Sequence, residues 1–211
     1  MRARLRQFES KGKGPLRVQI MFGLPDPLIP QAAALYWQAF GGKLGRVMGP
    51  EDRAHAFLAR VIRTDHCLSA IAPDGRLVGI GGFKSPYGSF AGGDAADMRA
   101  VYGRIGAAWR GALLRSLQSD IDNDRFLIDG ICVARDMRGM GIGGALVGAL
   151  KAEALERGYT AIRLEVIDTN IRARALYERT GFRVLRSESL GPLRHVFGFS
   201  RTTTMVCDLT L

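Results

Sequence analysis

The order of apolar and polar positions along the chain predicts alternating strands and helices. Short apolar runs predict strands at residues 16–22, 67–72, 77–83, 126–133, 161–167, 182–186 and 202–209. Apolar residues at intervals of three and four positions predict helices at residues 30–40, 51–63, 94–117, 141–157 and 170–180. Strands and helices mixed in this way indicate the α/β class.

Turn-forming residues separate these elements. Pro73-Asp74-Gly75 predicts a tight turn between two strands. Gly158 and Gly181 each follow a predicted helix, where a glycine commonly caps the last turn. Residues 41–49 are rich in glycine and residues 85–93 are mostly small, so both stretches are predicted to be loops.

Composition is typical of one globular domain. The chain has 211 residues, of which 47% are hydrophobic and 24% charged. We expect a basic tail at residues 1–14 and a single domain at residues 15–211. No apolar run is long enough to cross a bilayer, and the first residues lack the apolar stretch of a secretory signal. A cytoplasmic protein with no membrane partner is therefore expected.

The cysteines predict neither disulfides nor a metal centre. Cys67, Cys132 and Cys207 are scattered, and each lies within an apolar run. This arrangement is typical of buried thiols in a reducing compartment. No spacing of cysteine and histidine matches a metal site, so no metal is expected.

The chain is strongly basic, with 30 Lys and Arg against 20 Asp and Glu. A formal charge of +10 favours anionic partners. No predicted helix carries a dense basic stripe and no RNA-binding motif is present, so nucleic acid is not expected. A phosphate-rich cofactor and an acidic substrate remain as the candidate anionic partners.

A glycine loop, which we define as residues 138–144, lies between a predicted strand and a predicted helix. Its sequence is Arg138-Gly139-Met140-Gly141-Ile142-Gly143-Gly144. With few side chains, the backbone N–H groups can approach an anion closely, and the helix start adds free donors and a positive dipole end. The loop therefore predicts a site for a phosphate or pyrophosphate.

Two common phosphate motifs fit this loop poorly. Gly139, Gly141 and Gly144 match the dinucleotide pattern G-x-G-x-x-G, with Glu165 near the position of a ribose-binding acid. However, a polar stretch at residues 134–138 separates the strand from the glycines, and too few residues follow for the remaining strands of such a sheet. A Walker A loop lacks its lysine and its serine or threonine.

Two motifs together resemble the GNAT superfamily of acyl-CoA-dependent N-acetyltransferases. Arg138-x-x-Gly141-x-Gly143 is similar to the first signature of the superfamily, R/Q-x-x-G-x-G/A. The second signature is resembled by Asn170-x-x-Ala173-x-x-Leu176-Tyr177 followed by Gly181-Phe182. The resemblance is good over residues 126–186 and looser elsewhere. It implies a mixed, mostly antiparallel twisted sheet with helices on both faces.

The resemblance also implies where acetyl-CoA binds. The backbone of residues 138–144 would hold the pyrophosphate. The backbone of Ile131, Cys132 and Val133 would pair with the pantetheine arm like an added strand, and Asn170 and Ala173 would border the arm from the other side. The sheet would open after the strand that ends at Val133, and Tyr177 would protonate the departing thiolate.

Acyl transfer to an amine needs a base and an acid but no covalent nucleophile. An amine must be neutral to attack, and Asp129 is the candidate base because a carboxylate on an apolar strand face needs a partner or a function. Alternatively, Gly130 marks a bulge that turns Asp129 outward, and water serves as the base. Tyr177 is the candidate acid, or else a core aromatic residue. Cys132 is a weak candidate for a nucleophile because its neighbours are apolar.

The resemblance predicts transfer of an acetyl group from acetyl-CoA to a primary amine by direct attack in a ternary complex. The alternative is a non-catalytic domain that binds coenzyme A. The acceptor is left open as a small molecule or a peptide, and so is the oligomeric state, a homodimer included. One departure from the superfamily is an insertion at about residues 84–124, which we expect to border the acceptor site. The alternative is that this segment only covers the sheet.

Overall fold

The structure is a computed structural model that describes residues 5–9, 17–115 and 124–209. The strands are β1 (Leu5–Glu9), β2 (Arg17–Phe22), β3 (Cys67–Ile71), β4 (Leu77–Ser85), β5 (Gly88–Ser89), β6 (Phe126–Val133), β7 (Ala161–Ile167), β8 (Arg183–Ser189) and β9 (Arg201–Asp208). The α-helices are α1 (Ile29–Met48), α2 (Glu51–Val61), α3 (Ala95–Arg115), α4 (Ile142–Glu156), α5 (Ile171–Arg179) and α6 (Arg194–Phe197). Short 3₁₀ turns lie at Asp26–Leu28, Arg135–Met137 and Gly191–Leu193.

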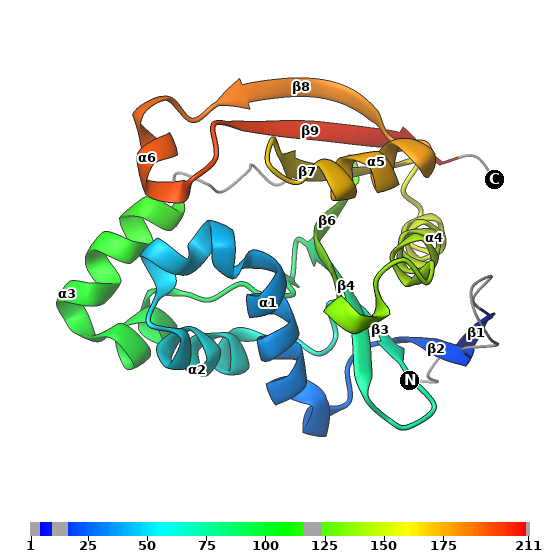
Figure 1. Cartoon of the computed structure of the whole chain (residues 1–211), viewed down its shortest axis with the longest axis horizontal. Coiled ribbons are helices and arrows are strands. Elements are labelled where there is room, and N and C mark those ends of the chain that lie inside the picture. The colour runs from blue at the N-terminus through cyan, green and yellow to red at the C-terminus, as the bar shows by residue number, and fades with distance from the viewer. Residues whose placement is uncertain (1–4, 10–16, 116–123, 210–211) are drawn as a thin grey trace.

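The strands form one sheet in the order β1-β2-β3-β4-β6-β7-β9-β8, with β5 paired to β4. The pair β6–β7 is parallel, and the other recorded pairs are antiparallel. Helices cover both faces, with α1 and α2 on one side of β4 and α4 on the other (Figure 1). The predicted mixed, mostly antiparallel α/β fold is confirmed.

Two glycines of β4 let α4 lie close to the sheet. A Cβ at Gly79 would lie 3.0 Å from Leu146 Cδ1, and a Cβ at Gly81 would lie 2.9 Å from Leu150 Cδ1. Gly79 and Gly81 are two positions apart on a strand, so both face the same helix. Because α4 carries the glycine loop at its start, this close packing also sets the position of the loop.

The prediction of a loop at residues 41–49 is wrong. The helix α1 continues through Gly41, Gly42 and Gly45 and ends at Met48. Val47 and Met48 are buried, and this burial outweighs the penalty of roughly 1 kcal/mol that each interior glycine imposes on a helix.

Several other boundaries also differ from the predictions. Part of the expected tail forms β1, which pairs with the free edge of β2. The expected loop at residues 85–93 contains β5, and α6 follows β8 without a counterpart in the predictions. The predicted helix 94–117 is two helical pieces joined at Gly103, whose φ is +70°, and residues 116–117 lie outside the described residues.

Candidate active site

The strands β6 and β7 are joined by two residue pairs and then separate. The parallel register joins Phe126 to Ile162 and Leu127 to Arg163, and no further pair follows among the described strands. Beyond this point β6 is paired with β4 alone. Its other edge is therefore open to an added extended chain, which could complete the hydrogen bonding of the strand.

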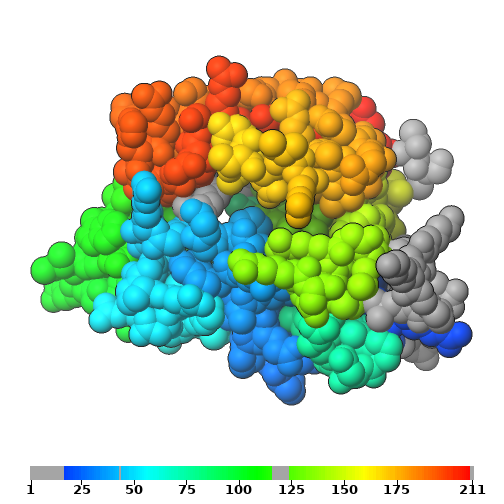
Figure 2. All heavy atoms as spheres, viewed as in Figure 1, coloured from blue at the N-terminus to red at the C-terminus, as the bar shows by residue number. Residues whose placement is uncertain are grey.

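A cavity of about 1600 Å³ occupies the space where the strands separate. The glycine loop and α5 line one part of it, and α1, α3 and the end of β4 line another. In Figure 2 the surface is hollowed between the gold part of the chain, which contains α5, and the lime-coloured part below it. The cavity thus has a glycine-loop side and an α1–α3 side, with β6 between them.

The glycine loop has the conformation of an anion site. Gly139 and Gly141 both have φ of +82°, a region that residues with a side chain rarely adopt. Gly141 caps the start of α4, so the first N–H groups of this helix have no acceptor within it. Four of the arginines that line the cavity belong to the loop, to the 3₁₀ turn before it or to α5: Arg135, Arg138, Arg172 and Arg179. The free N–H donors at the start of α4, the positive end of its dipole and the arginine side chains all favour a phosphate group at this loop.

The loop also lies against α5. A Cβ at Gly143 would be 3.1 Å from Leu176 Cδ2, and one at Gly144 would be 4.0 Å from Leu176 Cδ1. Met140 and Ile142 pack towards the core, so after Arg138 the loop offers mainly backbone to a ligand. The fold therefore brings the two signature segments together on one cavity, and a side chain at Gly143 would crowd Leu176.

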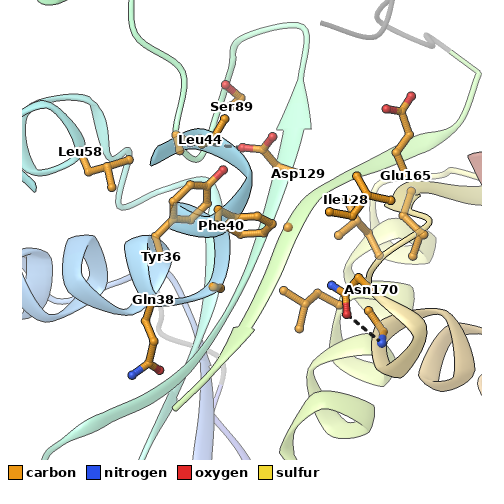
Figure 3. Close-up of a pocket in the computed structure, with 18 of the residues that line it drawn as sticks. Tyr36, Gln38, Phe40, Leu44, Leu58, Ser89, Ile128, Asp129, Glu165 and Asn170 are labelled. Carbon is orange, nitrogen blue, oxygen red and sulfur yellow. Dashed lines mark hydrogen bonds between the residues drawn. The ribbon is translucent and has the colours of Figure 1, made fainter. Parts of the chain in front are cut away.

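Asn170 begins the opposite wall. Its Oδ1 accepts a hydrogen bond from Ala173 N at 3.2 Å and so caps α5. Both residues line the cavity, and Figure 3 shows Asn170 on the other side of the β6 ribbon from Asp129. Since the cap uses the amide oxygen, the NH₂ group of Asn170 is the part that can donate to a ligand.

The open edge of β6 presents alternate residues to the cavity. Ile131 and Val133 line it, whereas Cys132 is 1% exposed and points into the core. Arg138 Nε donates to Val133 O at 3.2 Å, which ties the end of the strand to the glycine loop. With its side chain in the core, Cys132 has only its backbone at the open edge of the strand.

Asp129 lies at a β-bulge. Gly82 pairs with Gly130 and Phe83 pairs with Ile128, so Asp129 is an extra residue on β6. The bulge predicted from Gly130 is therefore present, but it does not turn the side chain to solvent. The Asp129 side chain is 11% exposed and lines the cavity. A bulge re-aims a side chain in this way without ending the strand.

Two groups hold the Asp129 carboxylate. Oδ2 accepts from Ala91 N at 3.2 Å, and Oδ1 lies 3.5 Å from Lys84 Nζ. Tyr36 and Phe40 of α1 face it across the opening, with ring centroids 4.4 Å apart (Figure 3). Burial, followed by the negative charge of Asp129, raises the pKa of Tyr36 well above its ordinary value, so this hydroxyl stays neutral beside the carboxylate.

Tyr177 lines the same cavity and is 7% exposed. Its ring lies 5.8 Å from that of Phe182, so the ring itself is a core aromatic. Burial, together with the nearby Cys132 thiol, raises the pKa of Tyr177 above its ordinary value. A phenol with a raised pKa carries its proton at neutral pH and is available as a donor.

Burial raises the pKa of the Cys132 thiol, and the charge of Asp129 adds to this effect. The thiol is therefore protonated and a poor nucleophile at neutral pH. Cys67, Cys132 and Cys207 are all buried and free. Within the described ranges, no cluster of His, Cys, Asp and Glu could hold a metal ion, and no helix has both the length and the hydropathy to cross a bilayer.

Sequence reasoning missed Tyr36, Phe40 and Lys84 as cavity residues. Tyr36 and Phe40 are four positions apart, so their shared helix face was visible in the sequence. Nothing local showed that this face meets Asp129, because the contact spans α1 and β6. It depends on Gly130, since a Cβ there would lie 2.7 Å from Phe40 Cζ.

The sequence model of the Acetyltransferase (GNAT) family matches residues 29–182. The match covers more than half of the chain and includes both signature segments. The chain belongs to the GNAT acetyltransferase family, which supports an acyltransferase activity. A curated relative, a "Probable N-acetyltransferase camello" of Xenopus tropicalis, is 39% identical over 75 residues. That alignment spans 36% of this chain and 34% of the relative.

Solved structures share the fold at low sequence identity. An insect putative arylalkylamine N-acetyltransferase 7 from the yellow fever mosquito superposes with a TM-score of 0.64 at 13% identity, over 99% of this chain and 96% of that one. The ribosomal-protein-S18-alanine N-acetyltransferase of Escherichia coli gives a TM-score of 0.53 at 16% identity, over 92% and 95%. At such identity these likenesses establish the fold.

Proposed function

We propose that the chain is an N-acetyltransferase that moves an acetyl group from acetyl-CoA to a primary amine by direct attack in a ternary complex. The observation that carries the proposal is the separation of β6 from β7 beside the glycine loop. It joins an anion site, an open strand edge and two polar side chains in one cavity. The acceptor is an amine on a small molecule or a peptide.

The residues on the glycine-loop side fit coenzyme A. The backbone at Gly139–Gly144 would hold the pyrophosphate, and the arginines of the cavity would neutralise it. The open edge at Ile131–Val133 would pair with the amides of the pantetheine arm, and the NH₂ group of Asn170 would border that arm. The bound thioester supplies an activated acetyl group.

Asp129 and Tyr177 are the residues proposed to transfer protons during the reaction. Asp129 Oδ1 is the proposed acceptor for the proton that the attacking amine loses, because this carboxylate is held in the cavity by Ala91 N and Lys84. The Tyr177 hydroxyl is the proposed donor to the leaving sulfur, because it lines the cavity beside the open edge of β6 and a phenol carries its proton at neutral pH. Neither role requires a covalent intermediate on the protein.

Gly141→Val is expected to weaken acetyl-CoA binding by roughly tenfold or more, because a branched side chain cannot adopt φ of +82° without strain and would obstruct the anion site. The measurement is the Kd for acetyl-CoA by calorimetry. Gly158→Val is the matched control, since Gly158 has the same φ at the other end of α4 and does not line the cavity. Unchanged affinity in Gly141→Val would place the cofactor site elsewhere.

We also propose that α3, within the insertion, lines the acceptor site. Ala108 is an exposed residue of α3 that borders the cavity. Ala108→Trp is expected to raise the acceptor KM by roughly tenfold and to leave the Kd for acetyl-CoA unchanged. The reason is that the indole ring would fill only the α1–α3 side of the cavity and not the glycine-loop side. Ala100→Trp changes an exposed residue of the same helix outside the cavity lining and is the control. An equal change of the acceptor KM in Ala108→Trp and Ala100→Trp would indicate that α3 only covers the sheet.

A further inference from the structure

The α1–α3 side of the cavity contains one pair of opposite charges in close contact. Lys84 Nζ lies 3.5 Å from Asp129 Oδ1, and both residues line the cavity. Lys84 belongs to β4 and Asp129 to the neighbouring strand β6, where the bulge brings the carboxylate into the cavity. The pair is mostly removed from solvent, with 29% of the Lys84 side chain and 11% of the Asp129 side chain exposed.

The two charges differ in how firmly they are held. The Asp129 carboxylate is fixed by a second contact, the hydrogen bond from Ala91 N. Within the described part of the chain, the Lys84 ammonium has no charged partner besides Asp129. A lysine head group on a four-carbon stem can rotate to a new anion at little cost. An incoming ligand can therefore share Asp129 and move Lys84, but it cannot easily move Asp129.

Apolar surface surrounds the pair. The rings of Tyr36 and Phe40 form a wall opposite Asp129 (Figure 3). Beyond them the lining includes six apolar side chains from α1, α2 and α3, namely Leu44, Met48, Phe57, Leu58, Met98 and Leu114. Asp94 and the α3 arginines Arg99, Arg104 and Arg115 also line the cavity, but no ion pair joins any of them to Lys84 or Asp129 among the described residues. A charged pair on an apolar wall is complementary to a ligand that has two adjacent opposite charges and an apolar body.

We infer that the acceptor is a free α-amino acid with an apolar side chain, bound through its ammonium to Asp129 and its carboxylate to Lys84, with the side chain against Tyr36 and Phe40. This inference rests on the proposed acetyl transfer and narrows its acceptor. A simple amine would compete with Lys84 for one carboxylate, whereas the amino acid offers each protein charge a new partner. A peptide N-terminus lacks the adjacent carboxylate and would meet the same competition.

The test uses three acceptors that differ in one group on the carbon that bears the amine. This group is a carboxylate in L-phenylalanine, a carboxamide in L-phenylalaninamide and a hydrogen in 2-phenylethylamine. Two readouts are measured, kcat/KM from thiol release and the Kd of each amine by calorimetry in the presence of coenzyme A. We expect the parent protein to prefer L-phenylalanine by about tenfold or more in both readouts, the size typical of one charge-assisted contact. Equal values for the three amines would overturn the inference.

Lys84→Met is expected to abolish the preference, because L-phenylalanine then loses the partner of its carboxylate while the two other amines no longer compete with Lys84 for Asp129. Lys84→Gln serves as a second variant if Lys84→Met does not fold, and Arg53→Met, on the exposed face of α2 outside the cavity, is the control. A preference that survives in the Lys84 variants would overturn the inference. If no amine is acetylated although acetyl-CoA binds, the proposed transfer fails, and the calorimetric comparison still decides whether Lys84 and Asp129 bind a zwitterion.

Discussion

Asp129→Asn is expected to lower kcat/KM for the amine by at least about 100-fold at neutral pH, because the amide cannot accept the proton that the attacking nitrogen loses. The loss should shrink as pH rises, since a growing fraction of the acceptor is then already neutral. The measurement is a pH profile of thiol release under saturating acetyl-CoA. Asparagine keeps the size of the side chain and the hydrogen bond from Ala91 N to its oxygen.

The control for this variant is Asp74→Asn, which changes an exposed carboxylate in the turn between β3 and β4. It should leave the pH profile unaltered. Full activity in Asp129→Asn would assign proton removal to water, the alternative that the sequence left open. A uniform loss at every pH, with a weaker Kd for the amine, would indicate that Asp129 binds the acceptor without accepting its proton.

Tyr177→Phe is expected to lower kcat by about 100-fold while the Kd for acetyl-CoA changes little, because it removes the proposed acid and keeps the ring. The ring packs against Phe182, so the variant should fold with at most a modest change in melting temperature. Single-turnover measurements are needed to make sure that chemistry limits the rate. Tyr159→Phe, on the loop before β7 and outside the cavity lining, is the matched control.

Wild-type turnover in Tyr177→Phe would show that Tyr177 is only a core residue. The coenzyme A thiolate would then leave without a proton from a protein acid. The raised pKa of Tyr177 bears on this outcome. A phenol that stays protonated to high pH predicts no loss of activity from its own ionisation in the neutral range. An alkaline fall in kcat near neutral pH would therefore point to another group.

The local elements of the site could be read from the sequence because they depend on neighbours in the chain. Glycines at fixed intervals before an apolar helix predict an anion loop, and Gly139 and Gly141 do have positive φ. Gly158 and Gly181 end helices as predicted, also with positive φ. Strands at residues 126–133 and 161–167 match the structure residue for residue, since each is a short apolar run between strong turn signals.

Only the tertiary structure decided how these elements meet. The helix α1 runs through its glycines because residues far away in the sequence bury Val47 and Met48. Gly130 predicted the bulge on β6, but only the packed structure shows that the Asp129 side chain lies in the cavity and not in solvent. Tyr36 and Phe40 of α1 and Lys84 of β4 meet beside β6 in the cavity, and no local pattern encodes that convergence. Local propensity and turn chemistry act over a few residues, whereas packing and register join residues that are far apart in the chain.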